Sequence, residues 1–189
     1  MRKAQTTAEL HPIILERWST RAFDAEYEIS EQEIVTMLEA ARWAASANNF
    51  QPWRFAVATR GDELFAKYTE TLAGFNKSWA PNASALIAVM YEKTDEKGDV
   101  RTSAPFDTGL AVGQLVLQAQ AIELHTHQIG GFDKDALLVA LGSPENLQPV
   151  VLIAVGKYSP DTDLPQEILK RESGNRERKE LSEIVIAGL

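Results

Sequence analysis

The stretch ALIAVMY, residues 85–91, is an apolar run without a charged residue. An unbroken run of this length is typical of a β-strand that is covered on both faces. Shorter strands are predicted at residues 55–59 and 149–155. Because helical patterns alternate with these strands, the sequence predicts an α/β or α+β class.

The helices around these strands are predicted from capping residues and from the spacing of apolar residues. Ser30 and Glu33 have the spacing of a capping box, which places a helix directly after them. The segment 107–123 is apolar almost all round, which predicts a buried central helix, and its Gly109 and Gly113 would let another helix approach closely. Helices are predicted at residues 31–46, 63–72, 107–123 and 133–141, with a surface loop at residues 92–102.

The C-terminal part of the chain becomes polar beyond Ser159. A polar tail with a few apolar residues near its end is hard to stabilise by packing against the domain of its own chain. The tail, at about residues 160–189, is therefore predicted to wrap a partner subunit. The whole chain, residues 1–189, is expected to form a single domain with this extension, since its length suits one globular core. The apolar residues left to bury in the tail are Leu181, Ile184, Val185 and Ile186.

Composition excludes several classes of function. The 189 residues contain no cysteine, which removes disulfides, thiolate nucleophiles and iron–sulfur clusters, so redox chemistry would need a bound cofactor. A net charge of -8 opposes binding to nucleic acid. No apolar run approaches the ~20 residues of a membrane span, and residues 1–10 lack a signal sequence, so a cytoplasmic protein with a small-molecule partner is expected.

The first candidate for a binding site is the segment Arg17-Trp18-Ser19-Thr20-Arg21. In an extended segment, side chains two residues apart point to the same side, so Arg17, Ser19 and Arg21 would face one ligand together. Two guanidiniums and a hydroxyl suit a phosphate monoester. A solvated surface turn is the alternative for so short a motif.

A second candidate lies in the segment AASANNFQPW, residues 44–53, between a predicted helix and a predicted strand. Its small residues permit the close approach of a flat ligand, while uncharged donors and acceptors are supplied by Ser46, Asn48, Asn49 and Gln51. Asparagines that follow a helix are also common caps, which is the alternative for each residue taken alone.

Two further pairs are weaker candidates. Gly130 and Gly131 precede a predicted helix, where backbone N–H groups could serve a ligand, although such pairs are usually turns. Arg176 and Arg178 could reach an anion from the tail, although such charges usually lie on solvated faces. The histidines His11, His125 and His127 lack the companions of a metal site, and the sequence has no nucleophile elbow, P-loop or Rossmann glycine motif.

Taken together, these motifs have the order and spacing of the nitroreductase family, which the sequence resembles from about residue 10 to 186. The resemblance implies an α+β fold with a central, mainly antiparallel sheet flanked by helices. It also implies an intertwined homodimer with exchanged C-terminal tails and two FMN molecules at the subunit interface. The sequence departs from the pattern of the family at three places. Ala45 stands where many members have proline, Gly130 stands where some have glutamate, and the region at residues 91–105 is short and lacks a helical lid insertion.

The resemblance also implies roles for individual residues. It gives no certain catalytic residue, because the flavin performs the chemistry, but Arg21 beside the pyrimidine edge and the Gly131 backbone near flavin N5 would tune it. Phe75 matches a residue on the substrate side. The residues that resemble FMN ligands are Arg17, Trp18, Ser19, Arg21, Ser46, Ala47, Asn49, Asn76, Gly130, Gly131, Arg176 and Arg178.

The activity implied by the resemblance is an FMN-dependent oxidoreductase. NADH or NADPH would deliver hydride to flavin N5, and a nitroaromatic, quinone or other conjugated acceptor would then take it in a ping-pong reaction. Three alternatives stay open: an FMN carrier or redox sensor without turnover, a reductive dehalogenase or flavin-fragmenting member of the same fold, and an interaction domain without flavin.

Overall fold

A computed structural model describes residues 3–188 of the chain. Its centre is a four-stranded sheet in the order β1-β2-β4-β3, in which every neighbouring pair is antiparallel. The prediction of an α+β class with an antiparallel sheet is therefore confirmed. The strands are β1 (Trp53–Thr59), β2 (Ala85–Glu92), β3 (His125–Ile129) and β4 (Leu147–Gly156).

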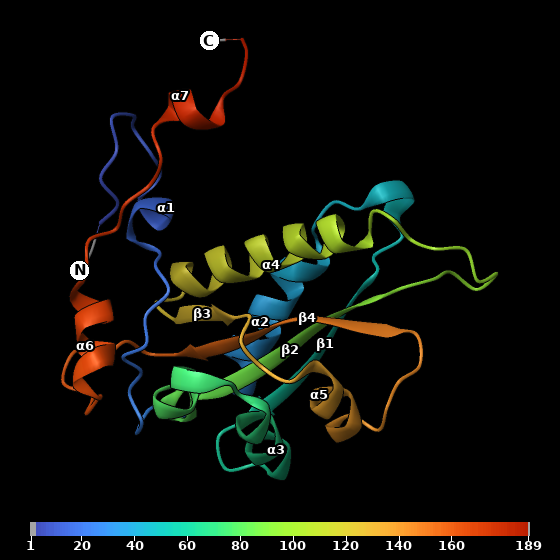
Figure 1. Cartoon of the computed structure of the whole chain (residues 1–189), viewed down its shortest axis with the longest axis horizontal. Coiled ribbons are helices and arrows are strands. Elements are labelled where there is room, and N and C mark those ends of the chain that lie inside the picture. The colour runs from blue at the N-terminus through green and yellow to red at the C-terminus, as the bar shows by residue number, and fades with distance from the viewer. Residues whose placement is uncertain (1–2, 189) are drawn as a thin grey trace.

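Helices cover both faces of the sheet, as the apolar run at residues 85–91 predicted. Alternate β2 residues enter two separate cores: Ile87 and Val89 pack with one face, and Leu86 and Ala88 with the other. In Figure 1, α4 lies above the sheet, and α3 and α5 lie below it. The core on the α4 side also contains residues of α2 (Glu31–Arg42) and α4 (Ala104–Ala121), and the opposite core contains residues of α3 (Glu63–Thr71) and α5 (Lys134–Ala140).

The helix α4 is not buried all round, and this part of the prediction is wrong for the single chain. Its Ala111 and Leu115 are fully buried against the sheet, whereas Phe106 is 69% exposed and Leu110 and Leu117 are more than a third exposed. No atom lies within 4 Å of a side chain built at Gly109 or Gly113. The outer face of α4, formed by Phe106, Gly109, Leu110, Gly113 and Leu117, is therefore an apolar surface without a packed neighbour among residues 3–188.

The first long helix begins as predicted and ends earlier. Ser30 and Glu33 form the predicted capping box, but α2 ends at Arg42, not at residue 46. The chain then forms a short 3-10 helix, Ala47–Asn49, in which Asn48 and Asn49 have φ angles of 50° and 57°. Ser46 itself has an extended backbone, with φ -146° and ψ 153°, so it lies in a loop between α2 and β1. Two further 3-10 helices, Gly74–Ser78 and Ala80–Asn82, precede β2.

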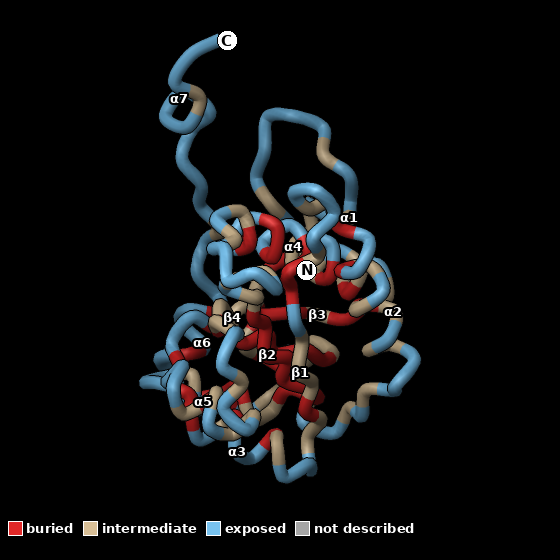
Figure 2. Tube along the Cα trace, turned by 90° about the vertical axis from the view of Figure 1, so that its right-hand side faces the viewer, coloured by how far each residue is buried: buried red, intermediate tan, exposed pale blue. Residues whose placement is uncertain are grey.

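The C-terminal segment packs partly on its own body, which the sequence did not predict. Leu164 and Ile168 are buried in the core below the sheet, so α6 (Gln166–Ser173) belongs to the main body. Beyond it, α7 (Leu181–Ile184) and the last described residues extend away from the body, and Ile186 is 98% exposed. Figure 2 shows this end of the chain as an exposed arm. Wrapping of a partner subunit stays a prediction for this arm only.

The N-terminal segment ends in a short helix, α1 (Pro12–Glu16), which leads directly into residues 17–21. Its N-terminus is capped by His11, whose side chain accepts a hydrogen bond from the Ile13 N–H. None of the helices within residues 3–188 is long and apolar enough to cross a membrane.

Candidate functional site: an arginine-lined pocket

The segment at residues 17–21 has the alternation that its sequence predicts. Trp18 and Thr20 are buried, whereas Arg17, Ser19 and Arg21 are half-buried and line one pocket. Trp18 also contributes to the pocket wall and packs edge-on against Tyr158, with ring centroids 5.3 Å apart. The extended backbone therefore presents two guanidiniums and a hydroxyl to the same space.

The C-terminal segment completes this pocket with three more arginines. Arg171, Arg176 and Arg178 line it together with Asn175 and Glu177. Burial lowers the pKa of Arg17, and the positive charges of Arg176 and Arg178 lower that pKa further. Such mutual repulsion is relieved when an anion enters the pocket. The predicted phosphate-binding residues of the two chain ends are thus neighbours.

Arg176 also attaches the C-terminal segment to the backbone that forms the wall of the pocket. Its two terminal guanidinium nitrogens donate hydrogen bonds to the carbonyl oxygens of Leu15 and Arg17, each over 2.8 Å. The Arg178 guanidinium donates locally to the Glu177 carbonyl over 2.7 Å. Arg176 therefore fixes the backbone at the start of residues 17–21, which we call the arginine segment. The position of Arg176 in the sequence did not reveal this role.

The inner side of residues 17–21 is held by two buried side chains that the sequence did not single out for this role. Glu172 of α6 accepts hydrogen bonds from the Thr20 hydroxyl over 2.6 Å and from the Arg21 N–H over 3.0 Å. His127 of β3 lies 2.9 Å from the Thr20 carbonyl oxygen through Nδ1. Because a carbonyl can only accept, that nitrogen carries the proton, and burial lowers the His127 pKa to about 4.

The glycine pair lies beside the segment that carries Phe75 and Asn76. The Asn76 side-chain amide donates to the Gly131 carbonyl oxygen over 3.1 Å, and the Ala73 N–H donates to the same oxygen over 2.9 Å. A Cβ atom at Gly131 would lie 2.9 Å from Asn76 Nδ2, whereas the space around Gly130 is open. Gly131 is therefore required for the close approach of two chain segments.

Phe75 lies on the pocket side of this arrangement. Its ring is about half exposed, and the Arg171 guanidinium lies 5.2 Å from the ring centroid. Gly130, Gly131 and Asn76 are not themselves among the residues that line the arginine pocket. The structure thus brings Phe75 close to the pocket through Arg171.

The predicted flavin-contacting residues Ser46, Ala47 and Asn49 lie elsewhere in the chain. The Ala47 N–H donates to the buried carboxylate of Asp107 over 3.2 Å, at the N-terminal end of α4. Figure 1 shows this end of α4 on the right, whereas α1 and α6 lie on the left. None of these three residues lines the arginine pocket of the same chain.

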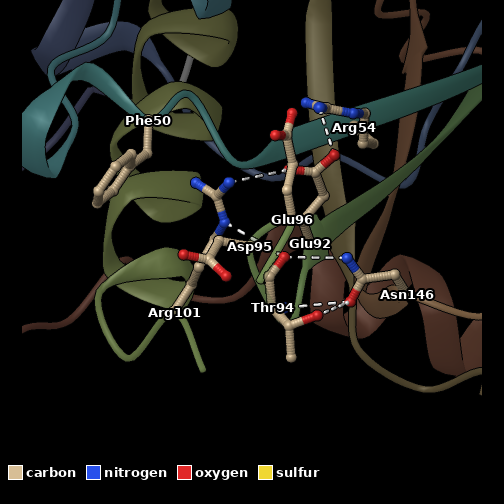
Figure 3. A pocket seen from close by; sticks show the side chains of 8 residues that line it. All are labelled: Phe50, Arg54, Glu92, Thr94, Asp95, Glu96, Arg101 and Asn146. Atoms are coloured by element: carbon tan, nitrogen blue, oxygen red, sulfur yellow. Dashed lines mark hydrogen bonds and ion pairs between the residues drawn. The ribbon is translucent and has the colours of Figure 1, made fainter. Parts of the chain in front are cut away.

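A second pocket is lined by Phe50, which closely follows Ser46 in the sequence, and by residues of β1 and β2 (Figure 3). Glu92 pairs with Arg54 and lies 3.8 Å from a guanidinium nitrogen of Arg101, whose guanidinium lies 4.8 Å from the centroid of the Phe50 ring. Three of its charged residues, Arg54, Glu92 and Arg101, thus interact with one another. The lining residues are Phe50, Arg54, Glu92, Thr94, Asp95, Glu96, Arg101 and Asn146.

Metal-binding clusters are absent from the described part of the chain, where no three His, Asp or Glu side chains gather in a suitable group. His127 uses Nδ1 for the Thr20 carbonyl, and burial lowers the pKa of His125. These two histidines of β3 are therefore part of the packed interior of the fold.

The fold and the pocket define an α+β domain with a sheet covered on both faces and a pocket lined by arginines from both ends of the chain. The nitroreductase family model matches residues 14–157, and the chain belongs to this family. The Bacillus subtilis protein YdgI, whose name places it among NAD(P)H nitroreductases, is 31% identical over 80% of this chain and 89% of its own length. An oxygen-insensitive NADPH nitroreductase of Helicobacter acinonychis is 29% identical over 77% of this chain and 85% of its own.

Solved structures show the same fold. A crystal structure described as an oxidoreductase containing FMN superposes with a TM-score of 0.91 and 32% identity, covering 98% of this chain and 94% of that one. A protein from Exiguobacterium sibiricum in complex with FMN superposes with a TM-score of 0.69 and 30% identity, covering 87% and 97%. The fold expected from the resemblance is therefore confirmed.

Proposed function

We propose that this chain is an FMN-dependent oxidoreductase of the nitroreductase type, with NADH or NADPH as the electron donor. The observation that carries the proposal is the pocket lined by Arg17, Arg21, Arg171, Arg176 and Arg178. Its relatives are named for NAD(P)H-dependent reduction, and two similar structures contain FMN. A phosphate-bearing flavin is the ligand that fits both observations.

The residues present suit FMN on physical grounds. The lowered pKa values of Arg17 and Arg21 reflect half-buried cations, which a phosphate would stabilise. Ser19 adds a hydroxyl between them, suited to the phosphate or ribityl chain. The open space at Gly130 would leave the backbone accessible to a flat ring.

When bound, FMN supplies a carrier for hydride between NAD(P)H and an acceptor. Arg17 and Ser19 would hold its phosphate end, and Arg176 keeps their backbone in place. Arg21 would place a positive charge beside the ring, where reduction adds negative charge, and the Gly131 backbone would lie near its reactive edge. The protein needs no dedicated acid or base for this reaction. The two substrates can use one open site in turn.

The acceptor would be a nitroaromatic, a quinone or another conjugated compound, with Phe75 on its side of the site. Phe75 is exposed and adjacent to Arg171, so it is free to contact an aromatic ring. Alternating use of one site by donor and acceptor gives a ping-pong mechanism, which parallel initial-rate lines would support and intersecting lines would contradict.

A homodimer would complete the site. The apolar outer face of α4, with Phe106 and Leu110, lies between the arginine pocket at one end and the Ser46 loop at the other. A two-fold axis across this face would bring the Ser46 loop of each subunit to the arginine pocket of its partner. The exposed arm with Ile186 would then cover the partner's surface, as the tail was predicted to do.

The visible spectrum of the purified protein tests the proposal, recorded with FMN before and after anaerobic addition of NADH or NADPH. Flavin bands that bleach, followed by steady turnover with a quinone, are expected. Bound flavin that neither donor reduces would favour a carrier or sensor without turnover. A protein that does not bind FMN at all would contradict the proposal.

A further inference from the structure

A buried carboxylate lies directly behind the arginine pocket. Glu172 is only 8% exposed, although it is the second-to-last residue of α6. Ile168, one turn earlier on α6, is buried in the core, so the same helix face directs Glu172 inward. A buried carboxylate is costly unless it is hydrogen-bonded, and this residue has two donors in the arginine segment.

Both donors belong to consecutive residues of that segment. The Thr20 hydroxyl donates to one carboxylate oxygen over 2.6 Å, and the Arg21 N–H donates to the other over 3.0 Å. The pair fixes the backbone at the point where the Arg21 side chain leaves it. The opposite side of Thr20 is fixed by His127 through its carbonyl oxygen.

The Arg21 side chain itself has restricted surroundings. Its guanidinium lies 6.0 Å from the ring centroid of Trp79, which is fully buried. The Trp79 ring in turn packs against His127, with centroids 4.5 Å apart. The Arg21 side chain therefore starts from a fixed backbone and points in a defined direction.

Glu172 also acts on Arg21 through its charge. Burial lowers the Arg21 pKa most, and the positive charge of Arg171 lowers it too, while the negative charge of Glu172 opposes both effects. The carboxylate is thus the counter-charge of a guanidinium that faces the pocket. A counter-charge of this kind weakens the positive field that the guanidinium exerts on a ligand.

We propose that Glu172 is a positioning residue for Arg21, and that its negative charge moderates the effect of Arg21 on the bound flavin. This inference rests on the proposed function, since it assumes FMN in the arginine pocket. It makes the C-terminal helix α6 part of the control of flavin reactivity, although Glu172 does not line the pocket.

The test uses Glu172→Gln in the full-length protein, which keeps the shape and removes the charge. The dissociation constants of oxidised and reduced FMN are measured, together with the midpoint potential of the bound flavin. Without the counter-charge, Arg21 should favour the anionic reduced flavin more strongly, so the ratio of oxidised to reduced dissociation constants should rise by roughly 3- to 10-fold. The midpoint potential should become more positive.

Glu167→Gln is the matched control, because Glu167 is an exposed residue on the same helix and its loss changes the net charge equally. It should leave the ratio unchanged. In an Arg21→Ala background, Glu172→Gln should have lost most of its effect on the potential, which a general loss of packing would not explain.

If Glu172→Gln does not fold, Thr20→Val gives the second test. It removes the hydroxyl that donates to Glu172 and accepts from the Ala22 N–H, and it leaves the carboxylate. Reduced FMN should then bind more weakly than in the wild type, and oxidised FMN should lose affinity by a smaller factor; wild-type affinity for reduced FMN in this variant would overturn the positioning role. A potential that stays at the wild-type value in a folded Glu172→Gln variant would overturn the electrostatic role. Failure of the wild-type protein to bind FMN would instead overturn the proposed function itself.

Discussion

The Asp107 carboxylate accepts a hydrogen bond from the Ala47 N–H over 3.2 Å, across 60 residues of sequence. The Ser103 hydroxyl donates to the same oxygen over 3.0 Å. This contact ties the loop that carries Ser46 and Asn49 to the first turn of α4, directly beside the exposed residue Phe106. The loop is therefore held in position at the surface where a second subunit is proposed to dock.

Asp107→Ala should lower both stability and flavin affinity. It leaves the Ala47 N–H without its carboxylate acceptor, which costs about 1–3 kcal/mol in free energy of unfolding. Urea unfolding and FMN titration measure the two effects. Asp135→Ala, at an exposed position in the first turn of α5, is the control. Equal behaviour of the two variants would show that Asp107 does not hold the loop.

Arg21→Ala should slow flavin reduction more than it weakens flavin binding. The charge of Arg21 matters most when the flavin gains negative charge, whereas Arg17 and Ser19 would continue to hold the phosphate. Stopped-flow reduction by NADH or NADPH under anaerobic conditions measures the first effect, and FMN titration the second. An unaltered reductive half-reaction would exclude this role for Arg21.

Gly131→Ala should destabilise the folded chain more than Gly130→Ala does. A methyl group at Gly131 would lie 2.9 Å from Asn76 Nδ2 and would push away the amide that donates to the Gly131 carbonyl. The same methyl group at Gly130 meets open space in the chain. The melting temperature should fall in the first variant, and a Gly131→Ala protein with the melting temperature of Gly130→Ala would contradict the contact.

His127 should make stability depend on pH in the weakly acidic range. Its pKa is lowered from 6.5 to about 4 by burial, so the unfolded chain binds a proton that the native state does not. The free energy of unfolding should therefore fall as the pH drops, by about 2 kcal/mol between pH 7 and pH 5. Chemical unfolding at several pH values measures the slope. His127→Gln should flatten it, and an unchanged slope would contradict the assignment.

Features that depend on neighbouring residues could be predicted from the sequence. The alternation of Arg17, Ser19 and Arg21 follows from an extended backbone alone, and the capping box of Ser30 and Glu33 from a spacing of three residues. The unbroken apolar run at residues 85–91 correctly predicted a strand with two covered faces. Each of these signals lies within a short stretch of the sequence.

Features that depend on distant contacts could not be predicted in this way. Glu172 meets Thr20 across 152 residues, and only the folded chain shows that α6 lies behind the arginine segment. The polar strand β3 joins the sheet by pairing with β4. No local pattern in the sequence indicates this pairing. Residues 43–46 contain neither Gly nor Pro, so no local signal in the sequence marks the end of α2 at Arg42.

The central claim, that the arginine pocket holds the phosphate of FMN, is tested most directly by comparing FMN with riboflavin, which lacks the phosphate. The wild-type protein should bind FMN more tightly than riboflavin by at least roughly 10-fold, because hydrogen bonds to a charged group contribute about 1.5–3 kcal/mol. Arg17→Ala should lose most of this preference while its riboflavin affinity stays unchanged. Equal affinity of the wild-type protein for the two flavins would contradict the account.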